Sequence, residues 1–180
     1  MIRLIKKYNR FLILSLIISG LYLSSLFNFI QNKSYHYDVT VYRDTWGVPH
    51  IYGITDEDTA YGLAYAHAED DFDTIFDILL FSRGVSASIK GKESAPIDYL
   101  VGLLKIWETV DEKYNTLSPK VINICNAYAD GINKYIEENP SYESRQIYPI
   151  VGKDIIAGFT FRTPLMYKLD WYITEIMKDE

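Results

Sequence analysis

The sequence is poor in cysteine and histidine, and it lacks the short motifs that mark many enzymes. Its single cysteine, Cys125, excludes an internal disulfide and any zinc site built on several cysteines. The three histidines, His36, His50 and His67, leave little material for a Ser-His-Asp triad. No serine lies in a G-x-S-x-G or S-x-x-K motif, and no glycine-rich loop has Walker spacing. These absences argue against a triad hydrolase and against a P-loop enzyme.

Positive charge is scarce outside the first ten residues. The chain has 18 Lys and Arg against 24 Asp and Glu, and four of the basic residues lie in residues 1–10. The remainder therefore has a net charge of −10. Such an acidic surface repels phosphate backbones, so nucleic acid is excluded as a partner.

The long hydrophobic run is confined to the N-terminus. Residues 11–30 contain no charged residue and follow the basic residues 1–10, a pattern typical of an export signal or of a membrane-spanning anchor. Both alternatives remain open. We predict a leader or anchor over 1–30, a polar linker over 31–37 and a folded region over 38–180. By the positive-inside rule this region lies outside the cytoplasm, periplasmic or secreted, with anchoring in the inner membrane through residues 11–30 as one alternative.

Alternating apolar residues and a central turn predict a β-hairpin over residues 38–53. Gly47 is the natural residue for positive φ in its turn, and Pro49 confines the second strand to an edge or a strand start. A two-stranded hairpin is too small to be an independent sheet. We therefore expect its edges to pair with strands that this chain does not contain.

The rest of the sequence predicts helices. Thr55 and Asp58 form a capping pattern at the start of a helix that ends at Gly84. Its expected apolar stripe consists of Tyr61, Tyr65, Ala68, Phe72, Ile75 and Leu79. Further helices are predicted over 96–110, over 119–138 with Ser118 as N-cap, and over 153–180 with a break near Pro164. Residues 86–94 and 141–153 are predicted to be loops, and Cys125 to be a buried thiol.

The predicted fold class is α+β, a mostly helical fragment with an N-terminal β-hairpin. Since the last residues are helical in pattern and have no cap, we expect the polypeptide to be incomplete.

A cluster of acids near His67 allows two interpretations. His67 and Asp71 are four residues apart, so they would share one helix face, with Glu69, Asp70 and Asp73 nearby. A metal site or an acid–base pair is one hypothesis, and calorimetry with zinc or calcium would test it. Because no second histidine is placed to help, we prefer a solvated acidic helix face.

Several blocks of sequence resemble the start of the α chain of the penicillin acylase family, which includes acyl-homoserine-lactone and cyclic-lipopeptide acylases. The order and spacing of these blocks hold from residue 39 to about residue 139. The chain departs from the family in having Leu63-Ala64 where many members have a glycine, and Glu69-Asp70-Asp71 where the family usually has Gln-Asp-Arg. The matching residues are Arg43, Asp44, Gly47 to Ile51, Gly62, Tyr65, Ala66, Ala68, Asp70, Arg83, Gly84 and Tyr128 to Ile136.

The resemblance implies an N-terminal-nucleophile hydrolase of αββα architecture. In such enzymes a precursor cuts itself, and the new N-terminal Ser of the β chain attacks an amide carbonyl with its own α-amino group as the base. The expected partners are therefore a β chain from the same precursor and a small acylated amide, and no catalytic residue is expected in this chain.

The resemblance also implies two supporting sites. Lys168 and Leu169 fall where the family places a basic and an aromatic residue of the acyl pocket. Glu175, in a segment similar to the family's S-E-I, becomes a candidate ligand of a structural calcium, the alternative being an exposed helical glutamate. No organic cofactor is expected. The alternative function is an inactive membrane-tethered fragment that acts as a binding or structural module.

Overall fold

The β-hairpin forms where the sequence predicts it. The structure, a computed structural model, describes residues 35–178, apart from a few side chains in two of the helices. Strands β1 (Val39–Arg43) and β2 (Pro49–Gly53) pair antiparallel, with Val41 opposite Ile51. Gly47 has a φ of 82° in the turn, which confirms its predicted role.

Helix α2 (Asp56–Arg83) begins and ends as predicted but is not continuous. Thr55 and Asp58 form the capping box, and Gly84 ends the helix with a φ of 65°. The expected unbroken stripe is wrong, because Asp71 has non-helical angles of −155° and 70°. Its carboxylate accepts hydrogen bonds from the Thr74 amide (3.1 Å) and hydroxyl (2.6 Å) and so caps the second half of α2.

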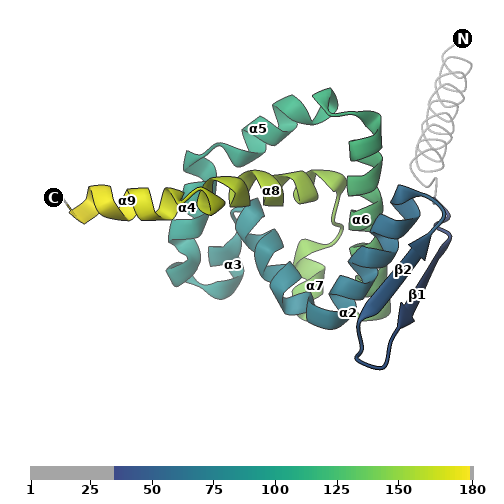
Figure 1. Cartoon of the computed structure of the whole chain (residues 1–180). Helices are drawn as coiled ribbons and strands as arrows, with labels where there is room; N and C mark the ends of the chain where they lie inside the picture. Colours follow the sequence, from purple (N-terminus) through teal and green to yellow (C-terminus); the bar gives the residue numbers. More distant parts are fainter. Residues whose placement is uncertain (1–34, 179–180) are drawn as a thin grey trace, which may run out of the picture. The chain divides into compact units, whose positions relative to one another are not determined.

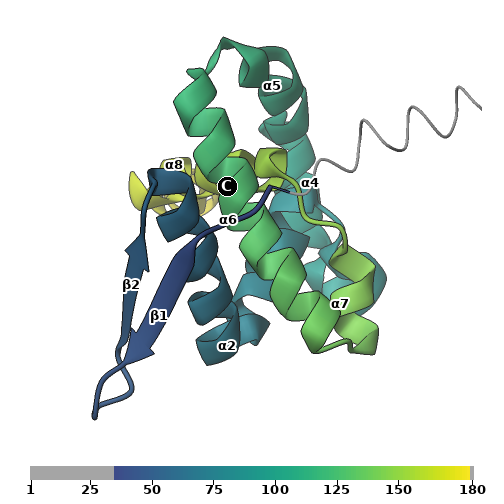
Figure 2. The same ribbon diagram turned by 90° about the vertical axis from the view of Figure 1, so that its right-hand side faces the viewer.

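Small residues let α2 pack closely on two sides. A Cβ on Gly62 would lie 2.5 Å from Val39 in the hairpin, so the helix and β1 are in direct contact there. On another side, a Cβ on Gly131 would lie 2.3 Å from the Tyr61 carbonyl oxygen. Gly131 belongs to helix α6 (Pro119–Glu138), so α2 lies between the hairpin and α6 (Figure 2).

The remaining elements differ from the predicted ones in three places. The predicted loop over 86–94 is helical, because the Asp98 carboxylate accepts the amides of Ser86 and Ala87. The predicted helix over 96–110 is broken at Lys105, which has a φ of 51°. The predicted loop over 141–153 contains a short helix. The elements are α3 (Ser86–Lys90), η1 (Lys92–Ser94), α4 (Ala95–Leu103), α5 (Ile106–Lys113), η2 (Tyr114–Thr116), α7 (Tyr142–Ile147), α8 (Gly152–Met166) and α9 (Leu169–Lys178).

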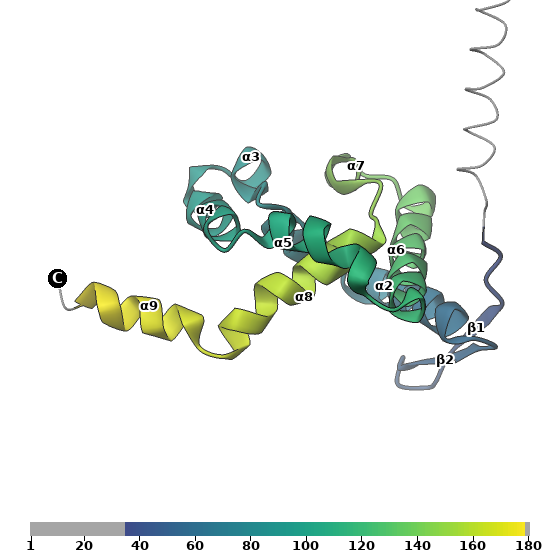
Figure 3. The same cartoon turned by 90° about the horizontal axis from the view of Figure 1, so that it is seen from above.

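The predicted break near Pro164 lies slightly further along the chain. Pro164 is inside α8, in its last turn, and the break comes at Lys168, which has a φ of 65°. Beyond this point α9 extends away from the other helices (Figures 1 and 3) and makes its main contacts with α8.

Two hydrophobic clusters hold the helices together. One joins α2, α6 and α7 around Leu80, Ile132 and Ile147, and the other joins α4, α5 and α8 around Ile106 and Ala157. No helix within residues 35–178 is long and apolar enough to cross a membrane. The predicted leader or anchor over residues 1–30 lies outside the described residues. The mostly helical fold with one hairpin is confirmed.

Candidate functional site

Asp44 organises the hairpin turn. Its carboxylate accepts the amides of Trp46 (2.8 Å) and Val48 (3.0 Å) and lies 3.2 Å from His50 Nε2. The contact with His50, together with the two amides, lowers the pKa of Asp44. Asp44 and His50, two residues of the first matching block, therefore shape the turn.

Arg43 fastens this turn to α2. Its guanidinium donates to the Gly47 carbonyl (2.9 Å) and forms ion pairs with Glu69 (3.0 Å) and Asp70 (2.8 Å). Two acids of the cluster near His67 are therefore used to hold the hairpin, which explains why acids are needed at that point of α2.

His67 and Asp71 form hydrogen bonds with different partners. His67 Nδ1 lies 2.9 Å from the hydroxyl of Tyr128 on α6, whereas Asp71 bonds Thr74. These contacts do not join His67 to Asp71, and no group of three His, Cys, Asp or Glu side chains within residues 35–178 is arranged to hold a metal. Because the kink at Asp71 interrupts the helix, the two residues do not form the site that their spacing suggested.

A buried ion pair joins the end of α2 to the start of α8. Arg83 donates to both carboxylate oxygens of Asp154, each at 2.7 Å, and Asp154 is 1% exposed. Arg83 also donates to the carbonyls of Ile147 and Pro149, in the turn that precedes α8. This pair sets the position of α8 against α2.

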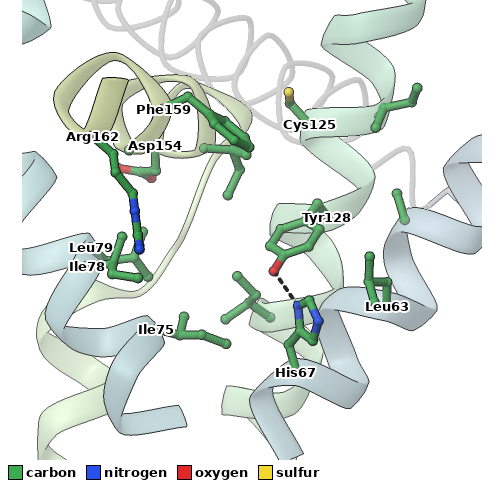
Figure 4. A pocket seen from close by; sticks show the side chains of 15 residues that line it. Leu63, His67, Ile75, Ile78, Leu79, Cys125, Tyr128, Asp154, Phe159 and Arg162 are labelled. Carbon is green, nitrogen blue, oxygen red and sulfur yellow. Dashed lines mark hydrogen bonds between the residues drawn. The ribbon is translucent and has the colours of Figure 1, made fainter. Parts of the chain in front are cut away.

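An open apolar groove lies between α2, α6 and α8 (Figure 4). Its volume is ≈ 530 Å³, within the range of sites for small organic molecules. The polar groups of its wall are His67, Cys125, Tyr128, Asp154 and Arg162. The apolar part consists of Ala60, Leu63, Ile75, Ile78, Leu79, Ile124, Ile132, Ile155, Gly158 and Phe159.

The predicted acyl-pocket residues lie at the corner between α8 and α9. Lys168 is exposed at the positive-φ break and Leu169 is half-buried at the first position of α9. Two apolar neighbours, Met166 and Tyr167, are 75% and 79% exposed, so this corner is open to a partner. Glu175, the predicted calcium ligand, is half-exposed on α9 and pairs with Lys178 at 2.7 Å. These three residues do not line the groove.

The sequence did not predict Asp154 or Arg162 as residues of a site. It also did not predict that Cys125 lines the groove. Asp154 and Arg162 received no role, although a lone arginine within the apolar run of α8 was a visible signal. Cys125 was correctly predicted to be buried, and burial raises the pKa of its thiol. That it lines the groove depends on the packing of α6 against α8, which no local pattern reveals.

Comparisons with known proteins agree on one family. A family profile described as penicillin amidase matches residues 38–174. Acyl-homoserine lactone acylase QuiP of Pseudomonas fluorescens is 29% identical over 99 residues, which are 55% of this chain and 12% of the relative. Penicillin acylase 2 proenzyme of Pseudomonas sp. is 31% identical over 101 residues, 54% of this chain and 13% of the relative.

A solved structure has the same fold. A thermostable penicillin G acylase from Alcaligenes faecalis, in tetragonal form, matches with a TM-score of 0.63 and 23% identity, over 74% of this chain and 76% of that chain. This chain is thus close in length to the solved one, whereas it spans only about an eighth of the curated relatives it matches.

Proposed function

The chain belongs to the penicillin amidase family, and we propose that it is the α-chain part of a hydrolase that cleaves linear amide bonds of small acylated amines. The family match over residues 38–174 carries this proposal, since it includes the hairpin, the groove and the corner between α8 and α9. The curated proteins similar to this chain include an acyl-homoserine lactone acylase and a penicillin acylase, so acylated lactones and β-lactams are the substrate classes to test.

The nucleophile in this proposal is an N-terminal serine on a separate β chain, within an αββα fold. Such a serine uses its own amino group as the base, so it needs no histidine from the α chain. One relative is named a proenzyme, and the solved relative has a chain close in length to this one. Both facts support a precursor that is divided into chains.

The corner between α8 and α9 is the part of this chain that we propose to reach the acyl group. Lys168 would face the substrate from the positive-φ break, and Leu169 would supply an apolar contact. The exposed side chains around the corner support this proposal, because apolar groups open to solvent are typical of an interface awaiting its partner. They include Met166, Tyr167, Trp171 and Tyr172.

A structural calcium site at Glu175 is a further part of the proposal. A carboxylate is a suitable hard ligand for calcium, but calcium takes six to eight oxygen ligands. Glu175 would have to release Lys178, and the remaining ligands would come from the β chain. The proposed location of the assembled enzyme is periplasmic or secreted, with residues 1–30 as a leader or an inner-membrane anchor.

The test is complementation. The chain is assayed alone and with a β chain of a family member, on penicillin G and N-octanoyl-homoserine lactone. We expect no turnover by the chain alone and turnover by the complex. Turnover by the chain alone would overturn the placement of the nucleophile. Failure to form any complex would instead favour the alternative, an inactive binding or structural module.

Two variants locate the acyl pocket within that experiment. In the complemented enzyme, Lys168→Met and Leu169→Asp are expected to raise KM. Lys92→Met changes another exposed lysine far along the chain from the corner and is expected to leave KM unchanged. Equal kinetics in all three variants would contradict the role of the corner.

A further inference from the structure

The groove between α2, α6 and α8 has an apolar wall and, among the described residues, one cation without a partner. Its acid, Asp154, already binds Arg83 and accepts the amide of Val151 at 2.9 Å. His67 and Tyr128 bond each other. Arg162, in contrast, is exposed and has no ion pair or hydrogen bond within the part of the chain that the structure describes.

Figure 4 shows how these groups are arranged. Arg162 reaches from α8 along the groove toward Ile78 and Leu79, while the His67–Tyr128 pair lies on the wall formed by α2 and α6. The guanidinium therefore lies beside apolar surface, and no carboxylate among the described residues forms an ion pair with it. A ligand that complements the groove combines an apolar chain with one negative charge.

We propose that this groove binds the anion of a medium-chain carboxylic acid, with its chain along the apolar wall and its carboxylate on Arg162. A guanidinium matches a carboxylate in a two-point geometry. The volume of ≈ 530 Å³ is sufficient for such a molecule. A polyanion fits poorly, since the chain as a whole has a net charge of −6. The inference is independent of the proposed hydrolase, because neither Lys168 nor Leu169 lines the groove.

The chain contains a built-in reporter for this site. Cys125 is its only cysteine, lies in the wall of the groove and is 7% exposed. The rate at which N-ethylmaleimide alkylates the whole 180-residue chain therefore measures access to the groove. We expect octanoate to slow this reaction at least fivefold at saturation, whereas octanol and octylamine have much weaker effects.

Chain length and charge are tested separately. From butanoate to octanoate, each added methylene is expected to tighten binding roughly threefold to fourfold. Arg162→Gln is expected to weaken the binding of octanoate at least tenfold. Arg145→Gln, which removes an exposed arginine of α7, is expected to leave this affinity unchanged. Equal protection by octanol, or unchanged affinity in Arg162→Gln, would overturn the proposal.

Gly158 gives a variant that closes the groove. A Cβ at this position would meet only Ile78, at 3.9 Å, so a side chain can leave the backbone there without a clash. Gly158→Leu is expected to abolish heat of binding with octanoate in calorimetry while the circular dichroism spectrum is unchanged. Gly102→Leu, in open space on α4, is the matched control.

Two further results would contradict the site. Octanoate binding that persists in Gly158→Leu would place it elsewhere. Protection of Cys125 that depends on protein concentration and not on octanoate would show that a second copy of the chain covers the groove.

Discussion

Arg83 and Asp154 are 71 positions apart and form a two-point ion pair with both N–O distances at 2.7 Å. Asp154 is almost completely buried. The same guanidinium donates to the carbonyls of Ile147 and Pro149, so one side chain holds the end of α2, the start of α8 and the turn between α7 and α8. This structural role accounts for Arg83, one of the residues that resemble the family's third block, whereas Gly84 ends α2.

Replacement of Arg83 should therefore lower the free energy of unfolding. Arg83→Met leaves a buried carboxylate without its partner, and we expect the free energy of unfolding to fall by about 3–5 kcal/mol. Urea denaturation followed by circular dichroism measures the change. Lys120→Gln breaks the exposed Lys120–Asp56 pair and serves as the control. Similar losses in both variants would contradict the importance of burial.

Gly131 and Gly102 should respond oppositely to the same substitution. A Cβ on Gly131 would lie 2.3 Å from the Tyr61 carbonyl oxygen and 2.9 Å from Ala64 Cβ, so α2 and α6 would have to separate. We expect Gly131→Ala to destabilise the chain by about 1–3 kcal/mol. Gly102 has open space around it, and Gly102→Ala should stabilise α4 by about 0.5–1 kcal/mol. Thermal unfolding of the two variants tests whether the close approach of α2 and α6 causes the loss of stability in Gly131→Ala.

Asp71 should behave as a helix cap. Asp71→Ala removes the acceptor of the Thr74 amide and is expected to lower Tm by roughly 2–4 °C. Asp71→Asn keeps a hydrogen-bond acceptor at this position and should lower Tm much less. Asp73→Ala, two residues on, is the control. If Asp73→Ala lowers Tm as much as Asp71→Ala, general charge rather than capping is responsible.

The pKa of Asp71 adds a pH dependence to the same experiment. The hydrogen bonds from the Thr74 hydroxyl and amide lower this pKa below 3.8. The stabilisation by Asp71 is therefore present above the unfolded pKa and is lost as pH falls through the folded one. The difference in Tm between the parent chain and Asp71→Ala should accordingly shrink in acid.

The hydroxyl of Tyr65 donates a hydrogen bond to Glu138 at 2.8 Å, and this bond should stabilise the chain within a defined pH window. It raises the pKa of Tyr65 from 10.0 to about 12 and, with Lys134, lowers the pKa of Glu138 below 4.5. The contribution of Tyr65 is fully present below pH 10 and is lost as pH rises through about 12. That of Glu138 is present above pH 4.5 and is lost as pH falls through its folded pKa.

The measurement is Tm as a function of pH. The difference between the parent chain and Tyr65→Phe should be constant at neutral pH and shrink between pH 10 and 12. Glu138→Gln keeps the shape of the partner and should remove the same alkaline slope. If the change of Tm between pH 10 and 12 persists in both variants, other tyrosines are its cause.

Local signals in the sequence predicted most element ends. Thr55, Asp58 and Gly84 bracket α2, Ser118 and Pro119 begin α6, and Gly47 makes the hairpin turn, because each acts on backbone within about four residues of itself. The cap at Asp71 was equally local, since its acceptor reaches Thr74. It was missed because the apolar stripe on both sides of Asp71 continues the period of a single helix.

The candidate site was less predictable. The sequence placed Lys168, Leu169 and Glu175 through a family resemblance, and their roles remain predictions. The acids near His67 could not be assigned from spacing, because their partner Arg43 is 26 residues away from Glu69. The groove, and the position of Arg162 within it, depends on three helices that are separated in the chain.

The sequence by itself determined the family, the hairpin and the main helices, because turns, caps and periodic apolar residues act over a few positions of the backbone. Only the tertiary structure decided which polar groups satisfy one another. Arg83 with Asp154, Arg43 with Asp70 and His67 with Tyr128 are all pairs distant in sequence, and each forms because α2 packs at once against the hairpin, α6 and α8. Within the described part of the chain this packing leaves Arg162 without a partner beside apolar surface, because that position depends on helices distant in sequence.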